Sequence, residues 1–151
     1  MKISLDLIKK LREETSAGVS DCRQALEDAK GDYEKAKKLI GERGIEKAAK
    51  KADRETAQGV VESYVHNGRV GVLVELRCET DFVGRNEEFK KLAHEICLQV
   101  AAVDPKDVKE LMESVYIRDP KLTIETLVKL TIAKTGENIA VGRFSRISLS
   151  E

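Results

Sequence analysis

The chain has 151 residues and is rich in charge, but its 27 lysines and arginines balance its 27 aspartates and glutamates. This length suits one domain of ordinary size, or a small domain joined to a medium one. Because non-specific nucleic-acid binding needs a surplus of basic groups to neutralise phosphates, we expect no stable complex with nucleic acid.

From the N-terminal sequence MKISLDLIKKLREE we expect no secretory signal peptide. This sequence carries charged residues within its first ten positions, so it lacks the apolar stretch that such signals contain. No apolar run in the chain approaches the ~20 residues that a membrane-spanning helix needs. We therefore expect a cytoplasmic protein with no membrane association.

Residues 1–45 are predicted to form a bundle of three short helices. The apolar positions of the first helix recur at helical spacing: Leu5, Ile8 and Leu11. The sequence TSAGVSD then interrupts the pattern, with Gly18 expected as a left-handed C-cap and Ser20 or Asp21 as the next N-cap. The second helix has its own apolar positions: Cys22, Ala25, Leu26 and Ala29. Asp32 is the expected N-cap of the third helix.

A helical connector is expected over residues 46–58. Its sequence, EKAAKKADRETAQ, contains good helix formers and few large apolar side chains. Its basic residues give it a positive face: Lys47, Lys50, Lys51 and Arg54. This face favours a solvated linker, and a contact with phosphate or with a partner is the alternative.

From Gly59 onward the pattern changes to strands. The runs GVVESYVH and RVGVLVELRC are rich in β-branched residues and flank Asn67-Gly68, which predicts a hairpin with a type I′ turn. The second run is apolar at most positions near its middle, so we expect a central strand covered on both faces. The final segment, NIAVGRFSRISLS, predicts a third strand with a bulge at Gly142.

Helices are expected between the hairpin and the last strand. Asn86 is the expected N-cap of the first of them, whose apolar stripe has five members: Phe89, Leu92, Ala93, Ile96 and Val100. Asp104 and Pro105 are expected to begin another helix, as its N-cap and first helical residue. A further helix ends at Gly136 after an apolar stripe: Ile124, Leu127, Val128 and Ile132. This order predicts an α+β fold, in which residues 59–151 form a three-stranded antiparallel sheet packed with helices.

The sequence offers little for covalent chemistry. Its three cysteines, Cys22, Cys78 and Cys97, form no Cys-x-x-Cys pair and are expected to be reduced thiols. His94 and Cys97 are spaced to face one metal ion, but two ligands are too few for zinc, and no Gly-rich phosphate loop occurs. A nucleophilic Cys78 assisted by His66 is a weak alternative. We therefore expect no catalytic residues, no metal and no cofactor.

The stretch CETDFVGRNEEF places Phe82 and Val83 between the end of a strand and the start of a helix. One interpretation is that both side chains plug the gap beneath the following helix. The other is that Phe82 is an exposed anchor for a protein partner, since buried aromatic anchors dominate many interfaces. The residue pattern alone leaves both interpretations open.

Two long motifs resemble those of the bacterial translation elongation factor Ts family. ELRCETDFVGRNEEF, which contains Thr80-Asp81-Phe82-Val83, resembles the second signature of that family, and LREETSAGVSDCRQAL resembles the first. GIEKAAKKADRETAQGVV and KTGENIAVGRF are also similar to family sequences. The resemblance covers nearly the whole chain in the right order. The chain departs from the family pattern at several positions: Ser16, Val19, Ser20, Arg23, Arg77 and Gly84.

The resemblance implies a guanine nucleotide exchange factor that binds elongation factor Tu in its GDP-bound and nucleotide-free states. It implies that the N-terminal bundle is similar to ubiquitin-associated domains and docks on the GTPase domain. The residues implied for that contact are Arg12, Val19 and Ser20. It also implies that the Thr80–Val83 segment binds the same partner, with Asp81 and Phe82 beside the magnesium and phosphate site. This favours Phe82 as the anchor and Val83 as the plug.

The resemblance also bears on the assembly. The chain lacks the second half-core and the coiled-coil insertion of long family members, and short members similar to it can dimerise. A three-stranded sheet leaves edges and a face to cover, so we expect a homodimer formed by the core of residues 59–151. The alternatives are an RNA-binding translation accessory protein that uses the basic connector, and a hydrolase that uses Cys78.

Overall fold

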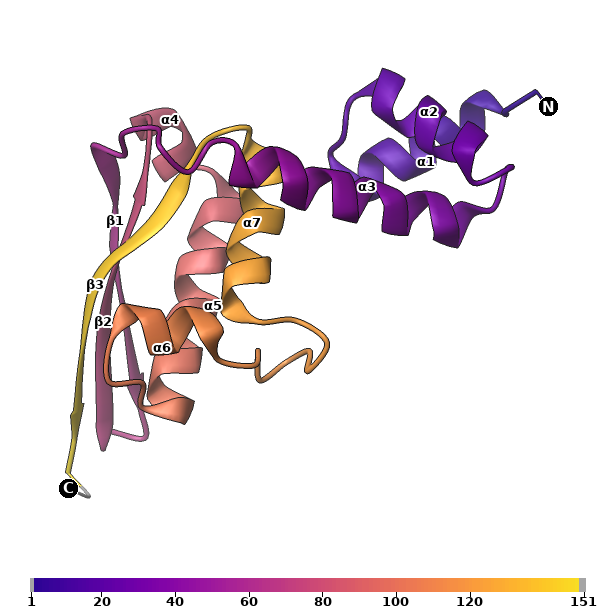
Figure 1. The fold of residues 1–151 in the computed structure, drawn as a ribbon. Helices are drawn as coiled ribbons and strands as arrows, with labels where there is room; N and C mark the ends of the chain where they lie inside the picture. Colours follow the sequence, from indigo (N-terminus) through magenta and orange to yellow (C-terminus); the bar gives the residue numbers. More distant parts are fainter. Residues whose placement is uncertain (1, 150–151) are drawn as a thin grey trace.

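The computed structural model describes residues 2–149 as a helical bundle joined by one long helix to an α+β core (Figure 1). The bundle consists of α1 (Leu5–Thr15), α2 (Val19–Asp28) and the first turns of α3 (Tyr33–Ala49). Its buried side chains come from all three helices: Ile8, Leu11, Cys22, Ala25, Leu26, Ala29 and Ala36. The predicted three-helix bundle is confirmed, as is the N-cap at Asp32, whose carboxylate accepts a hydrogen bond from the Lys35 amide.

The turn between α1 and α2 differs from the prediction. Ser16, not Gly18, ends α1 in the left-handed conformation, with φ of 59°. Because the Ser16 amide already bonds to a carbonyl in the last turn of α1, the helix ends two residues before the glycine. Gly18 has an extended backbone and is itself the N-cap of α2, which begins at Val19. The caps predicted at Gly18, Ser20 and Asp21 are therefore wrong.

Three antiparallel strands form one sheet in the order β1-β2-β3: β1 (Gln58–His66), β2 (Val70–Cys78) and β3 (Ile139–Ser148). The predicted hairpin is confirmed, because Asn67 and Gly68 both have positive φ, of 51° and 65°, as a type I′ turn requires. The central position of β2 is confirmed as well. The bulge is confirmed at Gly142, where the register between β2 and β3 shifts by one residue.

Four helices complete the core: α4 (Asp81–Gly84), α5 (Glu87–Val103), α6 (Val108–Glu113) and α7 (Ile124–Thr135). The N-cap of α5 at Asn86 and the C-cap of α7 at Gly136 are confirmed. The predicted start of α6 at Asp104 and Pro105 is wrong. Asp104 instead ends α5 in the left-handed conformation, and Asp107 is the N-cap of α6, with its carboxylate bonded to a backbone amide of the first turn.

The helix α3 extends from the bundle into the core without a break at its glycines. At Gly44 the helix lies so close to α7 that an added Cβ would be 2.9 Å from the Cβ of Ala133. α3 ends at Ala49, residues 50–54 form turns and a bend, and residues 55–57 have no regular secondary structure. The helical connector expected over residues 46–58 is therefore helical only as far as Ala49.

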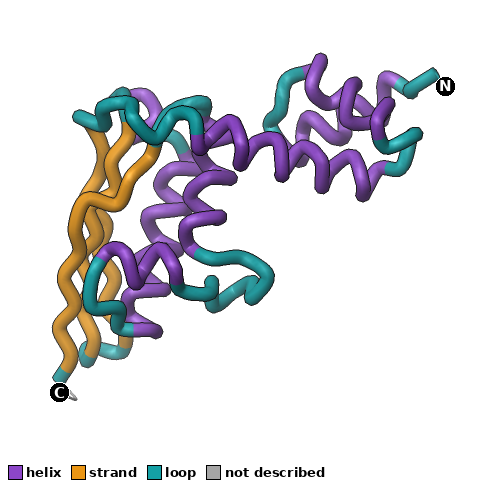
Figure 2. The backbone as a smooth tube through the Cα atoms, in the orientation of Figure 1, coloured by secondary structure: helices purple, strands orange, loops and turns teal. Residues whose placement is uncertain are grey.

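The core helices cover only one face of the sheet, as Figures 1 and 2 show. Val72, Val74 and Leu76 of β2 are buried on the helical side, whereas Leu73 on the opposite side is 52% exposed. We call this opposite side the outer face, and its exposed apolar residues are Val61, Val65, Leu73 and Ile147. The expectation that both faces of β2 are covered is therefore wrong for the single chain. The predicted α+β class is confirmed.

Candidate partner-binding surface

α4 is a single helical turn that follows closely on β2. Thr80 is its N-cap, and the Thr80 hydroxyl accepts a hydrogen bond from the Val83 amide at 3.3 Å. Val83 is only 5% exposed and packs in the core beneath the turn. Gly84 is also buried, and a Cβ added to it would lie 3.7 Å from the Cys78 sulfur, at ordinary contact distance. The turn is thus attached to the core by its inner side.

Phe82 lies on the outer side of this turn, where 76% of its surface is exposed. Val83, the next residue, is buried, so the turn directs the two apolar side chains to opposite environments. The exposed position predicted for Phe82 and the buried position predicted for Val83 are both confirmed. An aromatic ring held in water by a fixed backbone adds almost no stability to its own chain, but it is typical of residues that anchor an interface.

Asp81 is exposed beside Phe82 and forms an ion pair with Arg85 across the same turn. The Arg85 Nη2 atom lies 3.2 Å from Asp81 Oδ2, and both side chains are more than two-thirds exposed. An ion pair in this setting is worth at most about 1 kcal/mol, because water screens both charges. Asp81 can therefore exchange Arg85 for another cationic or hydrogen-bonding group at little cost.

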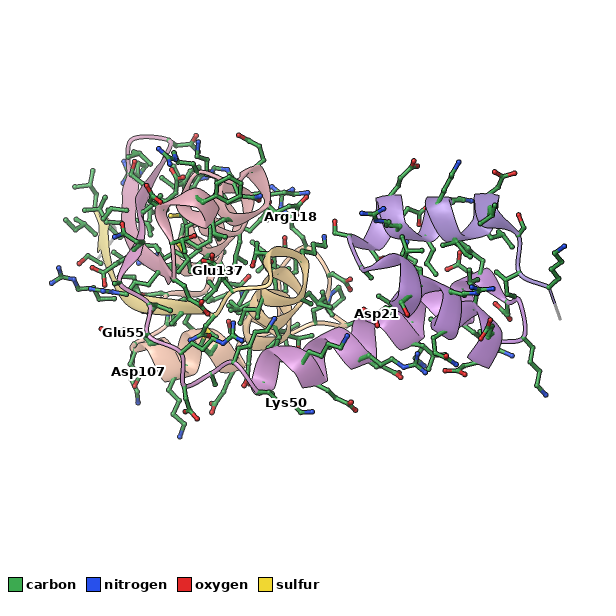
Figure 3. The ribbon with its side chains drawn as sticks, turned by 90° about the horizontal axis from the view of Figure 1, so that it is seen from above. Asp21, Lys50, Glu55, Asp107, Arg118 and Glu137 are labelled. Carbon is green, nitrogen blue, oxygen red and sulfur yellow. The ribbon has the colours of Figure 1, made fainter. Side chains whose placement is uncertain are left out.

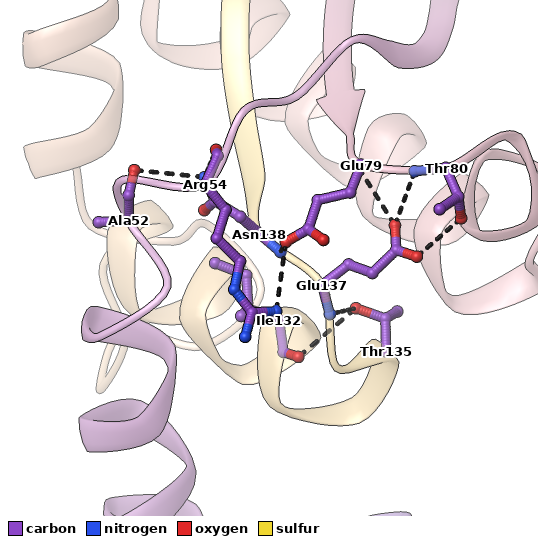
Figure 4. A network of polar contacts seen from close by, with 8 residues as sticks. All are labelled: Ala52, Arg54, Glu79, Thr80, Ile132, Thr135, Glu137 and Asn138. Atoms are coloured by element: carbon purple, nitrogen blue, oxygen red, sulfur yellow. Dashed lines mark hydrogen bonds and ion pairs between the residues drawn. The ribbon is translucent and has the colours of Figure 1, made fainter.

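A network of polar contacts joins this turn to the start of β3 (Figure 4). The Glu137 carboxylate accepts hydrogen bonds from the amides of Glu79 and Thr80 at 3.1 and 2.9 Å, and from the Thr80 hydroxyl at 2.7 Å. In the reverse direction, the Glu79 carboxylate accepts a bond from the Asn138 amide at 2.8 Å. The buried Asn138 side chain donates to the carbonyl of Arg54 at 2.8 Å. Glu137 and Asn138 were not among the residues predicted from the sequence, because their only local signal is their place between a helix C-cap and a strand.

The three residues implied for the bundle contact flank the turn that joins α1 to α2. Arg12 is in the last turn of α1, and Val19 and Ser20 are in the first turn of α2. All three are exposed, and Val19 has 51% of its surface in water. Figures 1 and 3 show that the bundle stands apart from the core, so these residues and the α4 turn form two separate surfaces.

The alternative based on a catalytic cysteine conflicts with the geometry. Cys78 pairs with Gln58 at one end of the β1–β2 hairpin, and His66 pairs with Val70 at the other end. The Cys78 thiol is buried, bonds to the Thr80 carbonyl at 3.1 Å, and has its pKa raised by burial. Burial stabilises the unreactive neutral form of a thiol, so the hydrolase hypothesis is wrong for this pair.

No metal centre is formed by the part of the chain that the structure describes: within residues 2–149, no three His, Cys, Asp or Glu side chains are grouped to hold a metal ion. His94 is exposed, whereas Cys97 is buried and burial raises its pKa to about 12. All three cysteines are unbridged. In the same described range, no helix combines the length and the apolar composition required to cross a bilayer.

The basic residues of the connector are partly compensated by acidic residues. Lys47 lies 3.2 Å from the Asp21 carboxylate of α2, and Arg54 lies 3.5 Å from that of Glu79. Lys50 is exposed at the C-terminal end of α3 (Figure 3), and Lys51 is half-buried. Since two of the four cations already face carboxylates, fewer of them remain to neutralise phosphates than the sequence suggested.

Comparisons with known proteins identify relatives of the whole chain. The family model described as Elongation factor TS matches residues 79–151. Elongation factor Ts of Thermotoga neapolitana is 42% identical, over all of this chain and 99% of the relative. Elongation factor Ts of Fervidobacterium nodosum is 39% identical over the full length of both chains. The chloroplastic Elongation factor Ts of Guillardia theta is 40% identical, over all of this chain and 90% of the relative.

These relatives are longer than the chain within the aligned region. The alignment with the Thermotoga neapolitana protein has 195 positions, whereas this chain has 151 residues. At least 44 positions of the alignment, the difference between these lengths, are therefore filled by the relative alone. Because the alignment covers all of this chain, these extra positions of the relative lie within the aligned region.

Proposed function

The chain belongs to the elongation factor Ts family, and from that premise we propose that it is a guanine nucleotide exchange factor for elongation factor Tu in translation elongation. It acts in the cytoplasm on the GDP-bound partner and remains bound to the nucleotide-free form. Its action is binding and displacement without covalent chemistry. The observation that carries the proposal is Phe82, a ring 76% exposed on a turn whose next residue, Val83, is buried in the core.

The mechanism follows from how GTPases hold GDP. Magnesium and backbone amides around the phosphates supply most of the affinity, so small displacements of those groups weaken nucleotide binding strongly. Phe82 enters an apolar crevice of the partner and holds the surrounding elements in a displaced position. Asp81 gives up its exposed pair with Arg85 and accepts hydrogen bonds from donor groups around the magnesium site of the partner. The energy gained by burying the ring is thereby used to destabilise bound GDP.

Thermodynamic linkage makes the effect reciprocal. If the chain weakens GDP binding by a given factor, GDP weakens binding of the chain by the same factor. Incoming nucleotide therefore displaces the exchange factor, and one molecule serves many partners in turn.

The bundle supplies the second contact in this proposal. Arg12, Val19 and Ser20 are exposed on the two sides of the turn between α1 and α2, and Val19 adds an apolar side chain to this surface. This contact holds the partner while the α4 turn reaches the nucleotide site, and α3 joins the two surfaces.

We also propose that the chain forms a homodimer through the outer face of its sheet. This face exposes several apolar side chains, as is typical of a surface that a partner covers. Two copies related by a two-fold axis would cover each other's outer face. The same face carries an ion cluster, in which the Glu75 carboxylate lies 2.9 Å from Arg77 Nε and 3.4 Å from Arg143 Nε. The Arg77 hydrogen bond lowers the pKa of Glu75, so the cluster stays charged at neutral pH.

Light scattering tests the dimer. At tens of micromolar we expect the mass of two chains, and we expect Leu73→Glu to give single chains because it places a charge at the centre of the outer face. Val115→Glu is the matched control, since Val115 is 55% exposed but belongs to the loop after α6. A monodisperse single chain for the unmodified protein would remove the dimer from the account.

Release of labelled GDP from elongation factor Tu tests the exchange activity itself. With excess unlabelled nucleotide present, adding the chain is expected to accelerate the release of labelled GDP in proportion to its concentration until the rate saturates. Raising the salt concentration separates this function from the RNA-binding alternative, because phosphate binding falls steeply with salt. A GDP release rate that stays at its spontaneous value at every concentration of the chain would refute the proposal.

A further inference from the structure

Phe82 is 76% exposed and lies outside the core, so its position depends on the backbone of α4. Only four residues form this helix, and an isolated turn of that length is unstable because the first turn fixes several dihedral angles for one hydrogen bond. The buried side chain of Val83 fixes one point of the turn. One fixed point leaves the orientation of the turn undetermined, so a second point of attachment is required at its start.

Thr80 provides that second point, and its hydroxyl is fully engaged. A hydroxyl has one proton to donate and lone pairs with which to accept. The Thr80 hydroxyl donates to a carboxylate oxygen of Glu137 at 2.7 Å and accepts from the Val83 amide at 3.3 Å. Because the proton points to Glu137, a lone pair faces the helix amide. The orientation of the N-cap therefore depends on Glu137.

Glu137 binds the backbone of the same segment as well as its side chain. Its other carboxylate oxygen accepts from the amides of Glu79 and Thr80 at 3.1 and 2.9 Å. These bonds lie just beyond Cys78 and Ile139, the last pair of the β2–β3 ladder. The carboxylate thus continues the ladder by one step, and bonds to an ionised acceptor are stronger than the backbone bonds they replace.

The position of Glu137 is itself fixed by the core. It follows Gly136, the left-handed C-cap of α7, whose amide bonds to the Ile132 carbonyl. The next residue, Asn138, is 6% exposed and bonds through its backbone amide to the Glu79 carboxylate. Glu137 therefore transmits the position of a packed helix end to a short turn that could not hold its shape alone.

We propose that Glu137 is a positioning residue for nucleotide exchange. It holds Thr80, and through Thr80 it holds the α4 turn in the conformation that presents Asp81 and Phe82 to the partner. A turn that is already ordered loses less conformational freedom on binding, so the complex forms more readily. This inference rests on the proposed exchange function and extends it to a residue 55 positions away from Phe82 in the sequence.

Two substitutions of Glu137 test this role by GDP release from elongation factor Tu. Glu137→Ala removes all three bonds, and we expect the second-order rate constant of stimulated release to fall by about tenfold or more. Glu137→Gln keeps the shape and one acceptor oxygen, so we expect a partial loss of about fivefold. Glu125→Gln is the matched control on α7, because Glu125 is exposed and pairs only with Lys129 among the ion pairs of the described residues.

The decisive comparison repeats Glu137→Gln in a chain that also carries Phe82→Ala. If Glu137 acts through Phe82, the Gln substitution should cause little further loss of exchange once the ring is gone. Hydrogen exchange provides a second readout: the amides of Thr80 and Val83 should exchange faster in Glu137→Gln, while the midpoint of global unfolding stays within a few degrees of the parent chain. A role limited to overall stability would lower the midpoint and leave the two substitutions independent.

The outcomes separate the inference from the function on which it rests. A parent chain that accelerates GDP release, with Glu137 variants that match it or lose activity independently of Phe82, overturns the positioning role alone. A parent chain with no effect on GDP release overturns the exchange function and the positioning role together. If Glu137→Ala fails to fold, Glu137→Gln still distinguishes these results.

Discussion

The junction between the bundle and the core depends on the close approach of α3 and α7 at Gly44. A Cβ added to Gly44 would lie 2.9 Å from the Cβ of Ala133, well inside the ~3.5–4.0 Å at which two carbons attract. Neither atom is at the end of a flexible side chain, so the two helix backbones must separate. We therefore predict that Gly44→Ala loosens the attachment of α3 to the core.

The magnitude follows from two opposing effects. Replacing glycine by alanine within a helix stabilises it by about 1 kcal/mol, and overpacking of a close contact costs about 1–3 kcal/mol. Gly44→Ala should therefore lower the free energy of unfolding by about 1 kcal/mol. Gly41→Ala in the same helix has nothing within 4 Å of its added Cβ, so it should raise that free energy by up to about 1 kcal/mol.

Urea denaturation followed by circular dichroism measures the free energy of unfolding of both variants. A compensating substitution on α7 provides a further check. Gly44→Ala combined with Ala133→Gly moves the methyl group from one helix to the other and should restore the stability of the parent chain to within about 0.5 kcal/mol. If Gly44→Ala proved as stable as Gly41→Ala, the close contact between α3 and α7 would be refuted.

Two further predictions concern a glycine of the sheet and two buried titratable groups, the Cys97 thiol and the Tyr116 hydroxyl. Gly59→Ala should lower the free energy of unfolding by about 3 kcal/mol in thermal or urea melts, because the new Cβ would lie 2.1 Å from the Leu76 carbonyl oxygen. Gly71→Ala has nothing within 4 Å and is its control; equal melts for the two would contradict the β1–β2 packing. Burial raises the pKa of Cys97 and of Tyr116 to about 12, from ordinary values of 9.0 and 10.0. Since both folded pKa values exceed the unfolded ones, stability should be constant up to about pH 9 and then fall towards pH 12, and a urea midpoint unchanged from pH 8 to 11 would argue against this burial.

Local signals predicted those parts of the fold that depend on neighbouring residues. The Asn67-Gly68 turn, the N-cap at Asp32 and the bulge at Gly142 follow from backbone preferences that act over a few residues. Where two local signals competed, the prediction failed. Asp104 and Pro105 suggest a helix start, but Asp104 closes α5, and Asp107 caps α6.

Contacts between distant segments were beyond the reach of the sequence pattern. Glu137 bonds to Thr80, 57 residues away, and no periodicity or turn motif relates the two positions. The apolar run of β2 misleadingly suggested cover on both faces, because such a run gives no indication of whether a second layer is present; the expectation that a three-stranded sheet leaves a face to cover was the better guide to the exposed outer face. In contrast, the segment Thr80–Val83 resembles a family signature, and this resemblance favoured an exposed Phe82 where residue patterns alone left the question open.

The most direct test of the account is GDP release from elongation factor Tu in the presence of Phe82→Ala. Phe82 is 76% exposed, so its truncation should leave the free energy of unfolding within about 0.5 kcal/mol of the parent chain. The account predicts that stimulated release falls at least about tenfold, the loss expected of an interface anchor. Ile117→Ala, which truncates another exposed apolar residue, should leave release unchanged. Unchanged stimulation by Phe82→Ala would contradict the proposed mechanism.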